Sequence, residues 1–236
     1  MVRGHCFYSR SLAFIRGSIL LCVELMNRTR VKICGVTRVE DALLACELGA
    51  EAIGMVMTPT SPRCVSVEHA RGIRDALPVF VDAVVLSHDL SAERVRVIID
   101  GVQPSLVQFH GSEDAGFCES FATKYLKAIG MDGDANVGAI TREHAHAAGF
   151  VLDGHPPGQQ GGRGKTFDWS RIPRDLGRPI LLAGGLNPEN VGDAIRAVRP
   201  WAVDLASGVE TSPGIKDAAK MRAFFAAVRA ADAGRS

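Results

Sequence analysis

The sequence predicts a parallel (β/α)8 barrel, in which eight strands alternate with eight helices in one domain. From residue 29 onward, short apolar runs alternate with amphipathic stretches, one pair about every 25 residues. A chain of 236 residues, 47% of them apolar, can bury one full core. An open doubly wound sheet is the weaker alternative, and its dinucleotide-binding form has no support because no Gly-x-Gly-x-x-Gly follows the first strand.

Each predicted strand is a short apolar run that ends at glycine, proline or a polar residue. The first run ends at Cys34 and is followed by Gly35, and the sixth ends at Asp153. The predicted strands cover residues 31–34, 52–57, 79–86, 105–109, 126–129, 150–152, 179–183 and 201–206.

Capping residues predict where the helices begin. Thr37 opens a Thr-x-x-Glu pattern before the first helix, Ser66 and Ser91 precede the next two, and Asn187 is followed by proline before the seventh. The predicted helices cover residues 39–48, 66–77, 91–100, 112–125 and 141–148, a brief turn near 172, a segment from 187, and 216–231.

The first 28 residues differ from the rest and are predicted to be an extension outside the barrel domain, which covers residues 29–236. This segment carries four arginines, and its apolar patch at 19–23 is shorter than a signal peptide requires. We favour a disordered or misassigned start, with Met26 as the initiator, over a targeting signal. The sequence holds no run of about 18 apolar residues, which excludes a membrane span.

Charge and cysteine content narrow the function classes further. The formal charge of +1, without a basic stripe, gives no nucleic-acid footprint. The six cysteines show neither Cys-x-x-Cys nor paired histidine spacing, which argues against a zinc site and a disulfide scaffold. We therefore expect a reduced, cytoplasmic protein that acts on a small molecule, without a metal and as a monomer or homodimer.

In a barrel, the residues that follow the strands converge at one mouth. Two of these segments, Gly184-Gly185 and Ser207-Gly208, follow the seventh and eighth strands, where barrels often bind phosphate through backbone N–H groups and a short helix. We therefore expect a phosphate site there. The complete set at the mouth is Cys34, Arg63, His110, Asp153, Gly184, Gly185, Ser207 and Gly208.

Seven segments, in order over residues 30–228, resemble the phosphoribosylanthranilate isomerases of tryptophan biosynthesis. They are KICGVT at 32–37, SPR at 61–63, VQFHG at 107–111, LD at 152–153, GGRG at 161–164 before FDW at 167–169, LAGGL at 182–186 and DLASGVE at 204–210. The resemblance implies an aldose–ketose isomerase that converts N-(5-phosphoribosyl)anthranilate into its 1-deoxyribulose 5-phosphate isomer by an Amadori rearrangement, without a cofactor.

The resemblance also implies roles. Asp153 would be the general acid, kept partly protonated by burial, and Cys34 the general base, kept partly ionised by nearby positive charge or a helix amino end. Arg63 would bind the anthranilate carboxylate, and His110 would contact either substrate or structure. Asp204 would pair either with the inward Lys32 or with the substrate amine. Lys32 itself is a poor candidate for the positive charge that would favour the Cys34 thiolate.

Two rival functions stay open. One is the related histidine-pathway isomerase, which uses two aspartates; Cys34 at the end of the first strand argues against it. The other is a barrel that only binds a sugar phosphate, for which neither Cys34 nor Asp153 would be needed. Arg163 departs from the family, which has a small Thr or Ser at this position of the glycine-rich loop. The resemblance therefore specifies the phosphate-binding contacts less completely than the catalytic residues.

Overall fold

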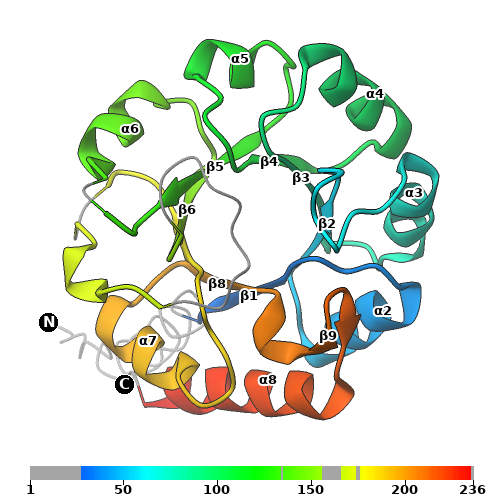
Figure 1. Cartoon of the computed structure of the whole chain (residues 1–236). Coiled ribbons are helices and arrows are strands. Elements are labelled where there is room, and N and C mark those ends of the chain that lie inside the picture. The colour runs from blue at the N-terminus through cyan, green and yellow to red at the C-terminus, as the bar shows by residue number, and fades with distance from the viewer. Residues whose placement is uncertain (1–27, 134, 156–165, 174–175, 235–236) are drawn as a thin grey trace, which may run out of the picture.

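A computed structural model describes residues 28–133, 135–155, 166–173 and 176–234. Eight strands, all parallel to their neighbours, close into a barrel in the order β1 to β8, and the helices form a ring around it (Figure 1). The predicted (β/α)8 barrel is confirmed, and the open sheet is wrong because β1 pairs with β8 as well as with β2. The proposed 1–28 extension lies almost wholly outside the described residues.

The barrel strands and the elements around them have the following bounds. The strands are β1 Arg30–Ile33, β2 Ala52–Val56, β3 Asp82–Ser87, β4 Leu106–Phe109, β5 Tyr125–Gly130, β6 Gly149–Asp153, β7 Ile180–Leu182 and β8 Ala202–Leu205. The helices are α2 Val39–Leu48, α3 Val67–Ala76, α4 Ala92–Val102, α5 Ala115–Glu119, α6 Val137–Glu143, α7 Val191–Val198 and α8 Ala218–Ala233, with 3-10 turns η1 Trp169–Arg171 and η2 Ser207–Val209.

Local capping sets several helix boundaries, but not the start of α2: Arg38 precedes this helix without a side-chain capping bond, and the Thr37 hydroxyl donates to the Gly214 carbonyl oxygen instead. The side chains of Ser66 and Ser91 accept hydrogen bonds from backbone N–H groups in the first turns of α3 and α4, and Asp217 does the same for α8. α2 ends at Gly49, whose φ of 108° is a left-handed conformation that glycine adopts without strain. The sequence located α2, α3 and α4 best.

Three predicted boundaries are wrong. β3 begins at Asp82 rather than 79, because Phe80 has a φ of 74° and is 97% exposed. The helix expected over 112–125 shrinks to α5, which Asp114 caps, and the positive φ of Ala122 turns the chain into β5. The helix expected over 141–148 lies earlier, as α6, because Asn136 caps it.

Two further differences lie near the end of the chain. The seventh helix begins at Val191 rather than 187, because the Asn187 carboxamide binds the N–H groups of Glu189 and Asn190 and holds a turn before the helix. Where the closing helix was expected to begin at 216, a small antiparallel hairpin of β9 Glu210–Ser212 and β10 Ile215–Lys216 precedes α8.

Strand alternation divides the side chains between two layers. Val31 and Ile33 of β1 belong to the large apolar cluster that also includes helix residues, while Lys32 and Cys34 point into the barrel. Smaller apolar clusters fill the interior beside and below them. In the described part of the chain, no helix has the length and apolar character to cross a membrane.

Candidate active site

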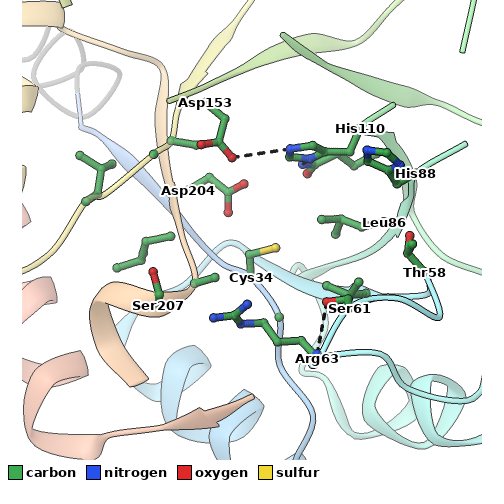
Figure 2. Close-up of a pocket in the computed structure, with 18 of the residues that line it drawn as sticks. Cys34, Thr58, Ser61, Arg63, Leu86, His88, His110, Asp153, Asp204 and Ser207 are labelled. Carbon is green, nitrogen blue, oxygen red and sulfur yellow. Dashed lines mark hydrogen bonds and ion pairs between the residues drawn. The ribbon is translucent and has the colours of Figure 1, made fainter. Parts of the chain in front are cut away.

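An open pocket with about 760 Å³ of space lies at the carboxyl ends of the strands. Figure 2 shows Cys34 and Asp153 on facing sides of this pocket, with Asp204 between them. The structure thus brings together residues from β1 to β8 that the sequence assigned to one mouth. The pocket is lined by eight of the nine predicted site residues, namely Cys34, Arg63, His110, Asp153, Gly184, Gly185, Asp204 and Ser207.

Cys34 lies at the end of β1 among three ionised side chains. The Lys32 ammonium lies below it and forms a buried pair with Asp204, with Nζ 2.8 Å from Oδ2. The Lys216 ammonium donates to the Cys34 carbonyl oxygen at 2.6 Å. Burial raises the pKa of the Cys34 thiol, and although the charges of Lys32 and Lys216 lower it, the net pKa remains above its usual value.

Two sequence-based expectations about Cys34 are corrected by this geometry. Lys32 was judged a poor source of positive charge, yet its long side chain reaches the thiol and is the leading charge that favours the thiolate. A net lowering of the thiol pKa was expected, but desolvation outweighs both ammonium groups. The expected pair between Lys32 and Asp204 is confirmed.

Asp153 ends β6 and lies against two imidazoles. Its Oδ2 is 3.6 Å from Nε2 of His110 and 3.9 Å from Nε2 of His155, and the two Nε2 atoms are 2.8 Å apart. Burial would raise the Asp153 pKa, but the hydrogen bond to His110 and the charges of both imidazoles hold the net pKa below its usual value. The expectation that burial keeps this carboxyl partly protonated in the free protein is therefore wrong.

Arg63 enters the pocket from the loop after β2. Its Nε and Nη2 bind the two oxygens of Glu210, with Nη2 2.7 Å from Oε2. That contact raises the guanidinium pKa, and the guanidinium and Lys216 hold the Glu210 pKa below its usual value despite burial. No protein group binds Nη1 among the described residues, so the edge formed by Nη1 and Nη2 can still hold a carboxylate in two hydrogen bonds.

The loops after β7 and β8 form the other end of the pocket. Gly184 and Gly185 have φ values of 83° and 64°, which only glycine adopts readily. Ser207 begins the 3-10 turn η2. Gly208 is the one predicted site residue that does not line the pocket. A Cβ at this position would collide with the Leu186 carbonyl, so Gly208 instead lets η2 pack against the loop after β7.

Several residues of the site were not assigned a role from the sequence. Glu210 lay in a recognised motif without a role, and its pairing with Arg63, 147 positions away, has no local signal. His155 stands two residues after Asp153 and was overlooked for the same reason. Arg163 and the surrounding glycine-rich loop lie outside the described residues.

Comparisons with known proteins bear on this arrangement. The sequence model described as "N-(5'phosphoribosyl)anthranilate (PRA) isomerase" matches residues 31–227, which is most of the chain. The chain belongs to the phosphoribosylanthranilate isomerase family. A family member from Stenotrophomonas maltophilia is 52% identical over 207 residues, covering 87% of this chain and 95% of the relative.

Solved structures of the family agree in fold. One, in complex with reduced 1-(o-carboxyphenylamino)-1-deoxyribulose 5-phosphate, is 38% identical, covers 86% of this chain and 99% of its own, and has a TM-score of 0.76. Another, described as monomers of the dimeric enzyme from Thermotoga maritima, is 37% identical, covers 85% and 98% of the two chains, and has a TM-score of 0.75.

Proposed function

We propose that this protein is a phosphoribosylanthranilate isomerase in which Asp153 is the general acid and Cys34 the general base. It converts N-(5-phosphoribosyl)anthranilate into 1-(2-carboxyphenylamino)-1-deoxyribulose 5-phosphate, a step of tryptophan biosynthesis. The observation that carries the proposal is the pair of proton-transfer groups, Cys34 and Asp153, on facing sides of one pocket. Family membership supports the same reaction.

The reaction needs two proton transfers, at the ring oxygen and at C2, the two sugar atoms on either side of C1. Asp153 gives a proton to the ring oxygen while the bond from this oxygen to C1 breaks and the anthranilate nitrogen forms an iminium with C1. Cys34 then takes the proton from C2, and the electron pair of that C–H bond forms an enolamine, which tautomerises to the ketone. Groups on opposite sides of the substrate can perform both transfers without moving.

The resting ionisation of each group defines what must happen first. The hydrogen bond to His110 and the charges of both imidazoles hold the Asp153 pKa below its usual value despite burial, so Asp153 must gain a proton before it can deliver one to the ring oxygen. Burial keeps Cys34 protonated, so a thiolate forms only in a small fraction of molecules, next to the ammonium groups of Lys32 and Lys216.

The two ends of the pocket suit the two ends of the substrate. The open edge of the Arg63 guanidinium would bind the anthranilate carboxylate. At the far end, no protein group binds the backbone N–H groups of Gly184 and Gly185 among the described residues, and together with Ser207 and the start of η2 they would bind the phosphate. Asp204, held by Lys32, lines the same pocket and would face the substrate amine.

The test is turnover of freshly generated phosphoribosylanthranilate, followed by the loss of its fluorescence. Relative to the unmodified protein, Cys34→Ala and Asp153→Asn should each lower kcat by a factor of about a hundred or more, the size expected for a lost acid or base. Cys46→Ala and Asp193→Asn, which change the same residue types outside the pocket, should turn over normally.

The outcomes separate the rival functions. Binding of the substrate without turnover by the unmodified protein would favour a sugar-phosphate sensor. Turnover of the histidine-pathway aminoaldose, but not of phosphoribosylanthranilate, would favour the related isomerase. We expect the protein in the cytoplasm, where the Cys34 thiol stays reduced, as a monomer or as a homodimer like the Thermotoga maritima relative.

A further inference from the structure

The cluster beside the proposed acid has the composition of a metal site. His110, Asp153 and His155 are brought together because β4 and β6 flank β5, and each of these two strands ends at the pocket. One ligand atom from each residue lies within 4.8 Å of the other two. Two imidazoles and one carboxylate form a donor set that suits zinc, cobalt, nickel or iron rather than magnesium or calcium.

The spacing of the three atoms fits a bound ion. Nε2 of His110, Nε2 of His155 and Oδ2 of Asp153 form a triangle with sides of 2.8, 3.6 and 3.9 Å. The point equidistant from these corners lies about 2.0 Å from each of them, which matches zinc–nitrogen and zinc–oxygen bonds of about 2.0–2.2 Å. An ion held by these three atoms alone would keep an open position, as catalytic zinc ions with three protein ligands do.

A buried amide supplies the outer partner that metal-bound histidines require. Nε2 of Gln108 lies 3.0 Å from Nδ1 of His110, so in this orientation Nδ1 accepts and Nε2 of His110 carries the hydrogen. Gln108 is fully buried, and its Oε1 has no partner in the described part of the chain. A half-turn of the amide puts Oε1 against Nδ1, the hydrogen moves from Nε2 to Nδ1, and Nε2 is free for the metal.

The position of the cluster predicts what a bound ion would do. His110 and Asp153 both line the pocket, and His155 lies behind them, almost fully buried. An ion that takes Oδ2 of Asp153 occupies the atom proposed to carry the proton to the ring oxygen, and its open position faces the substrate. The predicted inhibition rests on the proposed function, whereas the metal site itself does not.

We propose that His110, Asp153 and His155 bind one divalent transition-metal ion, such as Zn²⁺ or Co²⁺, and that the bound ion inhibits the isomerase. No local sequence pattern indicates this site, because the ligands follow two different strands and His110 is 45 positions from His155. The ion is an inhibitor of the reaction and has no part in its chemistry.

The test is a titration of the full chain, without an affinity tag and in a thiol-free reductant, with Co²⁺ alone. We expect one ion per chain by native mass spectrometry. The visible spectrum should show the absorption of Co²⁺ in a low-symmetry site, without the thiolate-to-cobalt charge-transfer band that a cysteine ligand would produce. His155→Ala should weaken binding at least tenfold, and His155→Gln is a second variant in case the first does not fold. His146→Ala, an exposed histidine of the same chain, should bind Co²⁺ normally.

Inhibition is measured separately. Zn²⁺ should stop turnover of the unmodified protein, and EDTA should restore it. Each variant's turnover is expressed as a fraction of its own metal-free rate. On this scale, the Zn²⁺ concentration that halves turnover should be at least tenfold higher for the His155 variants than for the unmodified protein. Mg²⁺ should have no effect. A sulfur charge-transfer band, or Co²⁺ binding that survives in both His155 variants, would overturn the site. Because the Co²⁺ titration needs no turnover, an inactive protein that binds Co²⁺ in this way would refute the proposed function and leave the site standing.

Discussion

Replacement of Lys32 by methionine tests the buried pair that joins β1 to β8. The Lys32 and Asp204 side chains are only 2% and 6% exposed, and their charged atoms are 2.8 Å apart. Methionine fills much of the same space but leaves the Asp204 carboxylate without a partner in the barrel interior. Removing one member of a buried pair costs about 3–5 kcal/mol, a large fraction of the about 5–15 kcal/mol by which domains are stable.

The assay is urea unfolding near neutral pH, followed by far-UV circular dichroism. The double variant Lys32→Met with Asp204→Leu should recover most of the lost stability, because it removes the stranded charge as well. Arg28→Met, which removes a half-exposed partner of Glu51, is the matched control and should cost less than about 1 kcal/mol. A Lys32→Met cost below about 1 kcal/mol, or a double variant no more stable than the single one, would refute the reasoning.

Three further predictions concern pH and the phosphate end. Because burial raises the pKa of Cys34, kcat/KM should rise between about pH 7 and pH 9 as the thiolate fraction grows; a flat profile would contradict this. The Glu210 pKa is lowered, so its ion pairs stabilise the fold above the usual carboxyl pKa and are lost as the pH falls through the folded-state value. Glu210→Gln should therefore lose less urea stability between about pH 7 and pH 3 than the unmodified protein does, and an equal loss would count against the linkage. Gly208→Ala should raise KM about tenfold through its collision with Leu186, while Gly72→Ala, which meets open space, should not; equal KM values would show that the η2 turn tolerates a Cβ.

The sequence was sufficient for the architecture and for most of the residues at the mouth. Apolar runs and helix caps located the eight strands and the best-capped helices, and parallel alternation then required Cys34 and Asp153 to face one pocket. Short helices were the weak point. α5 is five residues long, and the chain leaves it through a left-handed conformation at Ala122. An alanine does not predict that conformation, so the end of this helix could not be located from the sequence.

The ionisation of Asp153 and Cys34 could not be predicted from the sequence. The expectation that burial would control the Asp153 pKa omitted His155, whose Nε2 lies 2.8 Å from Nε2 of His110 and 3.9 Å from Oδ2 of Asp153. The charge environment of Cys34 likewise depends on how far the Lys32 side chain reaches, and on Lys216, which arrives from a hairpin that was not predicted. Interactions between distant segments fix these states, and local patterns do not encode them.

The strand origins of the site divide it between the two halves of the chain. Cys34, Arg63 and His110 follow β1, β2 and β4, whereas Asp153 and Asp204 come from β6 and β8. Neither a fragment of the first four strands nor one of the last four contains both proposed proton carriers. A chain cut between β4 and β5 would regain catalysis only when its fragments reassemble, so the turnover of such a split protein would serve as a direct reporter of half-barrel association.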